Sequence, residues 1–305
     1  MGEDRQTTVE ERGDPGALQG DQENSAPTAG RRNVTHRMRL LASAKALLVT
    51  IVVALFLKTF VVEAFRIPSG SMENTLLVGD FLLVNKLAYG LKTPRYIPMT
   101  TKAIPSVAIP VFGSVRRGDV LVFEYPGRRS EVDDNGPLYF IKRCIGLPGD
   151  TITIRSGEVS INGRQVLLPA RAKLIDGVRY AAGADYGPTF VPRKGDRLPL
   201  TVESVPAWKD FLEREQHRVE VSSEGKVLID GKEQSEYPVQ RNYYFMLGDN
   251  RGNSLDSRSW GFVPEDAIIG EALFVYWSWD PERSDDGERA TSGNIRWDRI
   301  GMLIR

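Results

Sequence analysis

Cysteine and histidine are scarce in this chain of 305 residues. It holds one cysteine, Cys144, and two histidines, His36 and His217. A single cysteine excludes an intrachain disulfide and a metal site built from several thiolates. Two histidines leave little material for a histidine-based zinc site or a Ser-His-Asp triad. Because no cluster of ligands is present, the sequence predicts no metal and no organic cofactor.

The chain also lacks a net charge. Forty Lys and Arg residues balance forty Asp and Glu residues, so no global field favours nucleic acid as a partner. Apolar residues make up 41% of the chain, near the globular average, which is enough for a proper core. The length leaves room for about two domains or one elaborated domain.

The charge that is present is unevenly distributed near the N-terminus. Residues 1–30 are acidic and have almost no large apolar side chains, a composition that cannot offset chain entropy by burial. Basic residues without an intervening acid follow, among them Arg31, Arg32, Arg37 and Arg39. We therefore predict a disordered tail that ends in a basic segment over residues 1–39.

A long apolar run follows over residues 40–62, interrupted near its far end by Lys58. It is just long enough for the ~20 residues that a bilayer span needs, and the stem of Lys58 can let its ammonium reach the headgroups. A buried core helix is one alternative, but such helices rarely show so little polar face. A cleavable signal peptide is another, opposed by the preceding polar residues and by the absence of an A-x-A site.

Basic residues flank only the N-terminal side of this run. The positive-inside rule then places residues 1–39 in the cytoplasm and the chain after residue 62 on the extracytoplasmic side. We expect a single-pass transmembrane anchor in the cell membrane, with the lipid bilayer as a partner.

The remainder of the chain has the pattern of short β-strands. Apolar or alternating runs bounded by Gly, Pro and Asn occupy residues 80–90, 119–127, 138–146, 150–166, 242–250 and 269–279. The pairs Asn162-Gly163 and Asp230-Gly231 predict two-residue hairpin turns. One helix is predicted at residues 206–217, where Pro206 suits the first turn. The predicted fold class is mainly β, preceded by a single transmembrane helix.

Four segments place chemically capable side chains within this structural pattern. In residues 65–76, Pro68 and Gly70 predict a sharp turn that presents a serine, although this segment taken alone favours a plain linker with turn-forming serines. In residues 138–149, apolar neighbours on the predicted strand favour a desolvated Lys142 with a lowered pKa, although a surface strand is the alternative. Residues 248–264 hold more hydrogen-bonding side chains than a turn requires. Residues 117–126 are typical of a strand with a tight entry turn.

Together these segments resemble the ordered boxes of the bacterial type I signal peptidases, or leader peptidases. The boxes are PSxSM after a membrane span, RGDxxxF, IKRxxGLPGD and GDNRxNSxDSRxWG. The resemblance runs from the anchor to about residue 165 and resumes at Tyr243, while residues 167–238 match no box. It implies a signal-peptidase-like catalytic β-domain over residues 63–166 and 239–305, with residues 167–238 as an inserted second subdomain.

The resemblance also implies a Ser–Lys dyad. Ser71 matches the nucleophile and Lys142 the general base, and Ser69 with the backbone N–H of Ser71 matches the oxyanion hole. Supporting residues implied by the last box are Ser254, which would hold the lysine amine in line, and Asp256 and Arg258, which would brace it. Two departures, Asn74 for a common proline and Gly252 for a frequent aspartate, leave these positions untouched.

The implied activity is removal of signal peptides from exported preproteins after small-x-small (A-x-A) sites. Shallow apolar pockets for alanine side chains would be lined by Phe65, Ile67, Met72, Leu76, Phe140 and Ile141, for which core packing is equally compatible. The preproteins and the bilayer are the expected partners.

General chemistry agrees with a lysine base. Serine needs an adjacent base to act as a nucleophile, yet His36 precedes the anchor and His217 lies in the unmatched region. For Lys142 to accept a proton near neutral pH, its pKa must fall about three units from ~10.4, which buried lysines can reach. Two other functions stay open: a self-cleaving Ser–Lys repressor, which would need a basic DNA-binding domain, and an inactive anchored domain that binds partners.

Overall fold

A computed structural model describes residues 29–93, 108–109, 113–127, 138–166, 185–281 and 294–305. The predicted tail up to residue 28 and the first part of the predicted insertion, residues 167–184, lie outside the described residues. The chain divides into two compact units, Met1–Val52 and Val53–Arg305.

The N-terminal helix α1 (Ala29–Phe56) continues into a π-helical turn, η1 (Leu57–Val61). The stretch Leu41–Val61 has a mean hydropathy of 2.1 and is long and apolar enough to cross a membrane. Its side chains are not buried against protein; Leu47, for example, is 62% exposed. A large exposed apolar surface is typical of a membrane-contacting segment, so the structure fits the predicted anchor and not a buried core helix.

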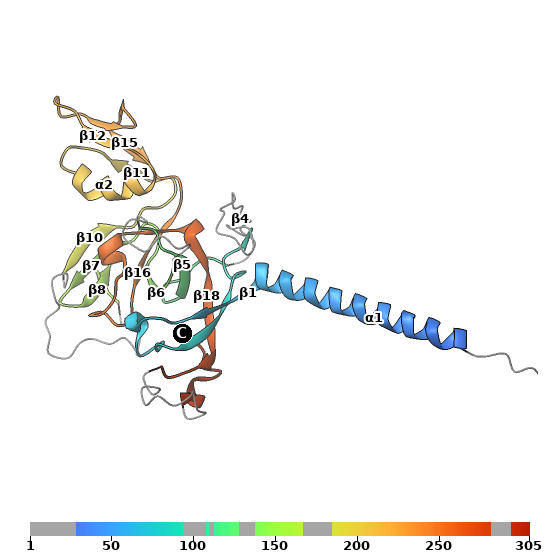
Figure 1. Ribbon diagram of the computed structural model, residues 1–305. Helices are drawn as coiled ribbons and strands as arrows, with labels where there is room; N and C mark the ends of the chain where they lie inside the picture. The colour runs from blue at the N-terminus through green and yellow to red at the C-terminus, as the bar shows by residue number, and fades with distance from the viewer. Residues whose placement is uncertain (1–28, 94–107, 110–112, 128–137, 167–184, 282–293) are drawn as a thin grey trace, which may run out of the picture. The chain divides into compact units, whose positions relative to one another are not determined.

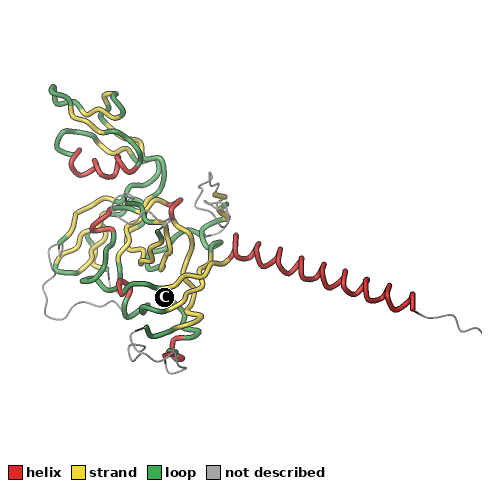
Figure 2. Tube along the Cα trace, viewed as in Figure 1, coloured by secondary structure: helices red, strands yellow, loops and turns green. Residues whose placement is uncertain are grey.

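Strands dominate the remaining chain (Figures 1 and 2). In chain order the elements are β1 (Val62–Arg66), η2 (Gly70–Met72), β2 (Asp80–Asn85), β3 (Leu91–Lys92), β4 (Ala108–Ile109), β5 (Val120–Glu124), β6 (Tyr139–Gly146), β7 (Thr151–Arg155), β8 (Glu158–Ile161), β9 (Arg164–Gln165), β10 (Tyr186–Phe190), β11 (Arg197–Pro199), α2 (Val205–Arg214), β12 (Val219–Val221), β13 (Val227–Ile229), β14 (Lys232–Glu233), β15 (Glu236–Pro238), β16 (Tyr243–Leu247), α3 (Ser257–Trp260), β17 (Val263–Pro264), η4 (Glu265–Ala267), β18 (Ile268–Ser278) and η7 (Trp297–Arg299). Each segment predicted to form strands contains at least one, which confirms the mainly β fold class.

The largest sheet has seven strands in the order β1-β2-β18-β5-β6-β16-β17, with antiparallel pairing throughout. Apolar residues on its faces form two buried clusters, one around Leu82 and Val122 and one around Phe123 and Trp260. This sheet carries the segments that the sequence analysis singles out.

A second sheet has the order β10-β7-β8-β9. Strands β7 to β9 come from the predicted catalytic domain, whereas β10 comes from the predicted insertion. A single buried cluster extends from Ile152 on β7 to Leu212 on α2 and Phe245 on β16. The described part of the predicted insertion therefore shares a core with the large sheet.

The local signals in this region are confirmed. Both residues of Asn162-Gly163 and of Asp230-Gly231 have positive φ, between 51° and 78°, as a type I′ hairpin turn requires. Helix α2 ends at Arg214, three residues before the predicted end. The reason is that Gln216 adopts a left-handed φ of 68°, which terminates a helix.

Candidate active site

The serine turn follows directly from the end of β1. Ser71 lies in the short 3-10 turn η2, and Ser69 before it has an extended backbone. Ser69 is exposed to solvent, whereas Ser71 is buried, with 8% of its surface accessible. Their hydroxyl oxygens lie 3.5 Å apart. The turn predicted from Pro68 and Gly70 thus presents two neighbouring hydroxyls at the edge of the sheet.

Asn250, from the loop after β16, holds this turn in place. Its backbone N–H donates to the Ser71 carbonyl oxygen at 3.1 Å. Its side-chain amide donates to the Gly70 carbonyl oxygen at 3.1 Å and to the Glu73 carboxylate at 2.9 Å. The sequence analysis does not identify this role, because neighbours in the chain give no sign that residues 70 and 250 meet.

Lys142 on β6 reaches the serine turn from across the sheet. Its Nζ donates to Ser71 Oγ at 2.7 Å and to the Ile141 carbonyl oxygen at 2.9 Å. Four strand spacings separate β1 from β6 in the sheet order, about 19 Å in a flat sheet. The sheet therefore curls until its first strand approaches β6, as the edge-to-face contact of Phe65 with Tyr139 at 5.5 Å also shows.

The environment of Lys142 favours the neutral amine. Only 4% of the residue is exposed, and its Nζ lies 5.2 Å from the centre of the Phe140 ring. Burial lowers the pKa of Lys142 to about 8, against the opposing effect of the Asp256 and Asp249 carboxylates. The direction of this shift agrees with the sequence prediction. A base with this pKa is partly neutral near physiological pH and can accept a proton from a hydroxyl.

A buried ion pair lies directly behind the lysine. Arg143 donates from Nε and NH2 to the two Asp249 carboxylate oxygens, at 2.8 and 2.6 Å. Thr75 Oγ1 donates to the same carboxylate at 2.6 Å. Arg143 is 2% exposed and Asp249 is fully buried. A buried pair of this kind costs several kcal/mol when one partner is removed, so it fixes β6, the serine turn and the loop after β16 in one arrangement.

The sequence analysis missed these three side chains as a group. They occur inside or beside the quoted boxes, and an arginine directly after the lysine and an aspartate after a buried strand were the available signals. Pairing between residues 143 and 249 cannot be read from either position alone.

Asp256 and Arg258, which the resemblance assigns to bracing the site, form an ion pair with each other, in which Asp256 is buried and Arg258 is half-buried. The Asp256 carboxylate accepts two bonds from the Arg258 guanidinium, both at 2.8 Å, and one from the Gly248 N–H at 3.1 Å. Asp256 also caps the N-terminus of α3 by accepting from the Arg258 N–H. This pair connects the end of β16 with α3.

Ser254 lies beside the serine turn but differs from the expectation in its hydrogen bonding. Its Oγ is buried and has no hydrogen-bond partner among the described residues, because the Lys142 amine donates to Ser71 and to a backbone carbonyl oxygen instead. Ser254 fits here because residue 248 is glycine: a Cβ at Gly248 would overlap the hydroxyl and would lie 2.5 Å from the Ser71 carbonyl oxygen.

The six apolar residues predicted to line substrate pockets are not all in one place. Five of them share one cluster below the serine turn: Ile67, Met72, Leu76 and Ile141, with the half-buried Phe65 packed against them. Phe140 instead packs with Trp260 and Tyr125, at ring distances of 5.2 and 4.9 Å. Met72 and Leu76 are fully buried, so they support the site from beneath and Phe65 is the more accessible member.

In the described part of the chain, no group of three or more His, Cys, Asp or Glu side chains could hold a metal ion. Cys144 is fully buried on β6, and burial raises the pKa of its thiol. A protonated, inaccessible thiol is a packing group and not a nucleophile. The chemistry available at the site is therefore that of a serine hydroxyl next to a buried lysine amine.

Comparison with known proteins extends this description. A family model described as "Signal peptidase, peptidase S26" matches residues 40–277. A signal peptidase I from Pseudomonas aeruginosa is 36% identical over 260 residues, which cover 81% of this chain and 76% of that protein. Signal peptidases I from Buchnera aphidicola and Aquifex aeolicus are 32% and 31% identical, covering 83% and 76% of this chain and 80% and 82% of those proteins.

A crystal structure of a signal peptidase I from Enterococcus faecalis has 23% identity and a TM-score of 0.28, over 52% of this chain and 97% of that one. The family match covers most of the chain, including both the candidate anchor and the serine–lysine site. The chain therefore belongs to the signal peptidase family, peptidase S26, and this membership supports removal of signal peptides by a serine peptidase as its activity.

Proposed function

We propose that this protein is a membrane-anchored endopeptidase that removes signal peptides from exported preproteins after small-x-small sites, with Ser71 as nucleophile and Lys142 as general base. The observation that supports this best is the 2.7 Å contact between Ser71 Oγ and Lys142 Nζ. Both side chains are buried, and the pKa of the amine is lowered to about 8. Together these features provide what an activated serine needs.

The reaction begins when the neutral Lys142 amine takes the proton of Ser71 Oγ as that oxygen attacks the scissile carbonyl. The oxyanion that forms accepts hydrogen bonds from the Ser71 N–H and the Ser69 hydroxyl. Lys142 then gives its proton to the leaving amine of the mature chain. In the second half, Lys142 activates a water molecule that hydrolyses the acyl-enzyme and frees Ser71.

Ser254 and the buried pairs have positioning roles in this scheme. The Ser254 hydroxyl, which has no described hydrogen-bond partner, is suited to accept a bond from the protonated amine after proton transfer. The Asp256–Arg258 pair holds the loop that carries Ser254.

Preference for small side chains follows from limited space beside the serine turn. Phe65 and Phe140 are half-buried, and Ile141 precedes the base directly on β6. Bulky side chains would overlap these groups, and steric exclusion of this kind gives specificity without strong attraction.

The proposed topology places residues 1–39 in the cytoplasm, an anchor over residues 40–62, and a catalytic β-domain (63–166 and 239–305) with its insertion (167–238) on the extracytoplasmic side. The supporting observations are the apolar span Leu41–Val61 and the basic residues that precede it. A shared membrane raises the effective concentration of the enzyme relative to a signal peptide held in the same bilayer.

The test is processing of a preprotein with an A-x-A site by the detergent-solubilised full chain. We expect one cleavage after that site, lost by at least about 10³-fold in Ser71→Ala and Lys142→Ala. Ser223→Ala and Lys194→Ala change exposed residues of the same types away from the site and should cleave normally. Ordinary turnover by either site variant would remove that residue from the mechanism. Absence of cleavage by the unmodified chain would favour the inactive binding domain.

A further inference from the structure

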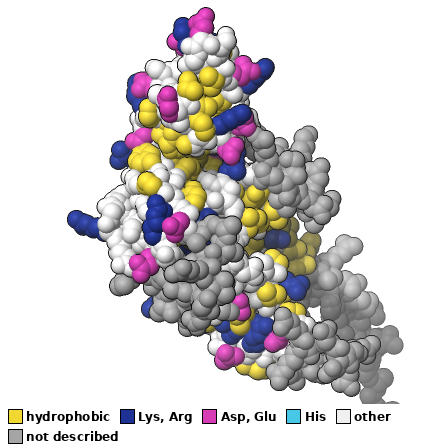
Figure 3. Space-filling model, turned by 90° about the vertical axis from the view of Figure 1, so that its left-hand side faces the viewer, with side chains coloured by type: hydrophobic (Ala, Val, Ile, Leu, Met, Phe, Trp, Pro, Cys, Tyr) yellow, Lys and Arg dark blue, Asp and Glu magenta, His cyan; other side chains and the backbone are white. Residues whose placement is uncertain are grey.

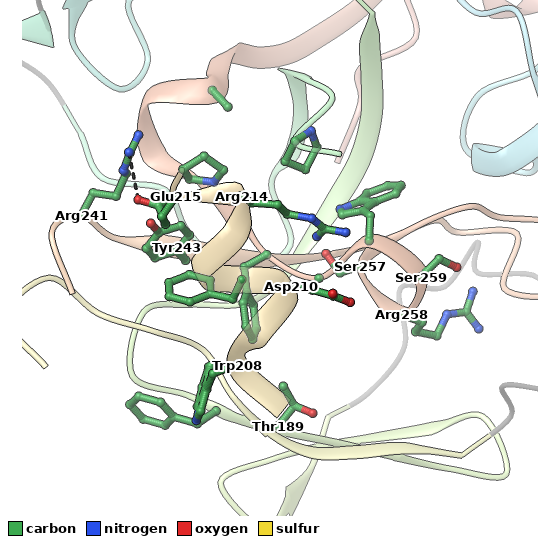
Figure 4. A pocket seen from close by; sticks show the side chains of 18 of the residues that line it. Thr189, Trp208, Asp210, Arg214, Glu215, Arg241, Tyr243, Ser257, Arg258 and Ser259 are labelled. Carbon is green, nitrogen blue, oxygen red and sulfur yellow. Dashed lines mark hydrogen bonds and ion pairs between the residues drawn. The ribbon is translucent and has the colours of Figure 1, made fainter. Parts of the chain in front are cut away.

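A cavity of about 670 Å³ lies apart from the dyad, between α2 and α3. Its other walls come from β10, the end of β5 and the start of β16, and neither Ser71 nor Lys142 lines it. Figure 4 shows it from close by, with Asp210 and Arg214 of α2 on the side that faces Ser257 of α3. We refer to it as the α2–α3 pocket.

Two hydrogen-bond donors in the α2–α3 pocket have no acceptor among the residues that the structure describes. Trp260 is 1% exposed, and its indole Nε1 has no hydrogen-bond partner among the described residues. Arg214 is half-buried and forms no ion pair with a residue that the structure describes. The Arg214 guanidinium approaches the backbone next to Trp260. A Cβ atom added at Gly261, the residue after Trp260, would lie 3.2 Å from Arg214 NH1. Both donors therefore line one wall, where an acceptor with negative charge would satisfy them.

The other arginines of the pocket are paired, and one of its carboxylates is exposed to solvent. Arg241 pairs with Glu215 at 2.9 Å and with Asp266 at 2.8 Å. Arg258 is held by the carboxylate next to α3. Asp210, one helical turn before Arg214, is exposed to solvent, where its field is strongly screened. Of the three arginines that line the pocket, Arg214 is thus the one without an ion pair to a described residue.

Aromatic side chains form much of the remaining surface. Tyr125, Trp208, Phe211 and Phe262 all line the pocket. Hydrophobic side chains between charges of both signs are also visible on one face of the molecule in the space-filling view (Figure 3). A pocket with aromatic walls and a few donors is suited to a peptide segment with apolar and acidic side chains.

Phe140 connects the α2–α3 pocket with the dyad. Its ring centre lies 5.2 Å from Lys142 Nζ and 5.2 Å from the ring centre of Trp260. The lysine amine and the pocket wall are therefore no more than about 10 Å apart, which about three residues of extended chain can span. About three residues of a substrate cleaved at Ser71 are therefore long enough to reach the Trp260 wall of the pocket.

We propose that the α2–α3 pocket binds the first residues of the mature part of the preprotein, and that Arg214 pairs with an acidic side chain about three residues beyond the scissile bond. This inference rests on the proposed function, because it assigns a second binding site to the same substrate. The acidic side chain belongs to the mature part, since a signal peptide consists of a basic region, an apolar region and small residues at the cleavage site.

The test uses the full chain in detergent and three peptides that share one A-x-A site and differ at the third mature position, with Glu, Gln or Lys there. We expect Arg214→Ala to lower kcat/KM for the Glu peptide about tenfold, the effect of one charge-assisted hydrogen bond. The loss should lie in KM, with kcat unchanged; kcat/KM should stay the same for the Gln peptide and should not fall for the Lys peptide, which Arg214 repels. Arg214→Lys should restore part of it. Arg218→Ala, which removes an 80% exposed arginine outside the pocket, is the matched control.

A binding measurement separates the pocket from the proposed chemistry. Ser71→Ala protein is titrated calorimetrically with the mature part of the Glu peptide alone, with and without Arg214→Ala. Binding that depends on Arg214 would support the pocket even if the unmodified chain cleaved none of the peptides, an outcome that would count against the proposed function alone. Equal effects of Arg214→Ala on all three peptides, or an equal loss in Arg218→Ala, would overturn the inference.

Discussion

Replacement of Lys142 by methionine measures how much the buried ammonium lowers the free energy of unfolding. Methionine fills a similar length without a charge, and it leaves the sheet that surrounds residue 142 in place. Lys142 is 4% exposed, and burial lowers its pKa from 10.5 to about 8. The variant should be inactive and, near neutral pH, more stable than the unmodified protein.

The size of this gain follows from linkage between protonation and folding. Since the folded-state pKa lies below the unfolded value, the unfolded chain binds more protons between pH 8 and 10.5. The stability of the unmodified protein therefore rises with pH across this window. Below about pH 8, Lys142 is protonated in the folded protein, which then carries the full free-energy cost of the buried ammonium. At 1.36 kcal/mol per pKa unit, that cost is about 3 kcal/mol.

The measurement is urea unfolding of both full-length proteins in detergent, followed by tryptophan fluorescence at about pH 7 and about pH 11. Differences in packing between lysine and methionine are the same at both values. The free energy of unfolding of Lys142→Met relative to the unmodified chain should thus be about 3 kcal/mol larger at the lower pH. Lys194→Met, at an exposed site, should show no such pH dependence. A Lys142→Met difference that did not change with pH would refute the claim that burial lowers the pKa of this amine.

Three further predictions concern the same site. If the neutral Lys142 amine is the base, kcat/KM for a preprotein should rise with pH and reach half its maximum near pH 8; a profile that is flat from pH 6 to 9 would contradict this. Gly248→Ala should lower kcat about 100-fold, since its methyl group displaces Ser254 and the serine turn, and wild-type kcat would show that the site tolerates the overlap. Asn74 has a φ of 80°, which glycine adopts freely and proline cannot. Peptide cleavage should therefore survive in Asn74→Gly and fall about tenfold or more in Asn74→Pro. The reverse order would show that the turn has another conformation.

The backbone of the turn at Asn74 gives a structural reason for asparagine, in place of the proline common in the box, at this position. Glu73 and Asn74 are the central residues of a tight turn closed by a bond from the Thr75 N–H to the Met72 carbonyl oxygen. A type II turn requires positive φ at its third residue, which asparagine tolerates. A proline at position 74 would need a different backbone here, three residues after Ser71.

Local features of this protein could be predicted from sequence because they depend on neighbours in the chain. The apolar run predicts the span Leu41–Val61, and the Asn-Gly and Asp-Gly pairs predict two type I′ turns. Alternation of apolar residues predicts strands at the right places, because side chains on a strand alternate between two faces. The helix at α2 was predicted as well, with an end set three residues too late.

The boxes suggested which residues act together, but their arrangement depends on contacts that no local pattern encodes. Ser71 and Lys142 meet at 2.7 Å although 71 positions separate them, because the sheet curls and brings its edge strand to β6. Burial of the amine and the pairing of Arg143 with Asp249 also depend on such contacts, as does the place of Arg214 in one pocket with Trp260. Sequence alone determined the strands, turns and span through short-range backbone preferences, whereas only the packed tertiary structure decided which polar groups lie together in a dry environment and how their pKa values shift.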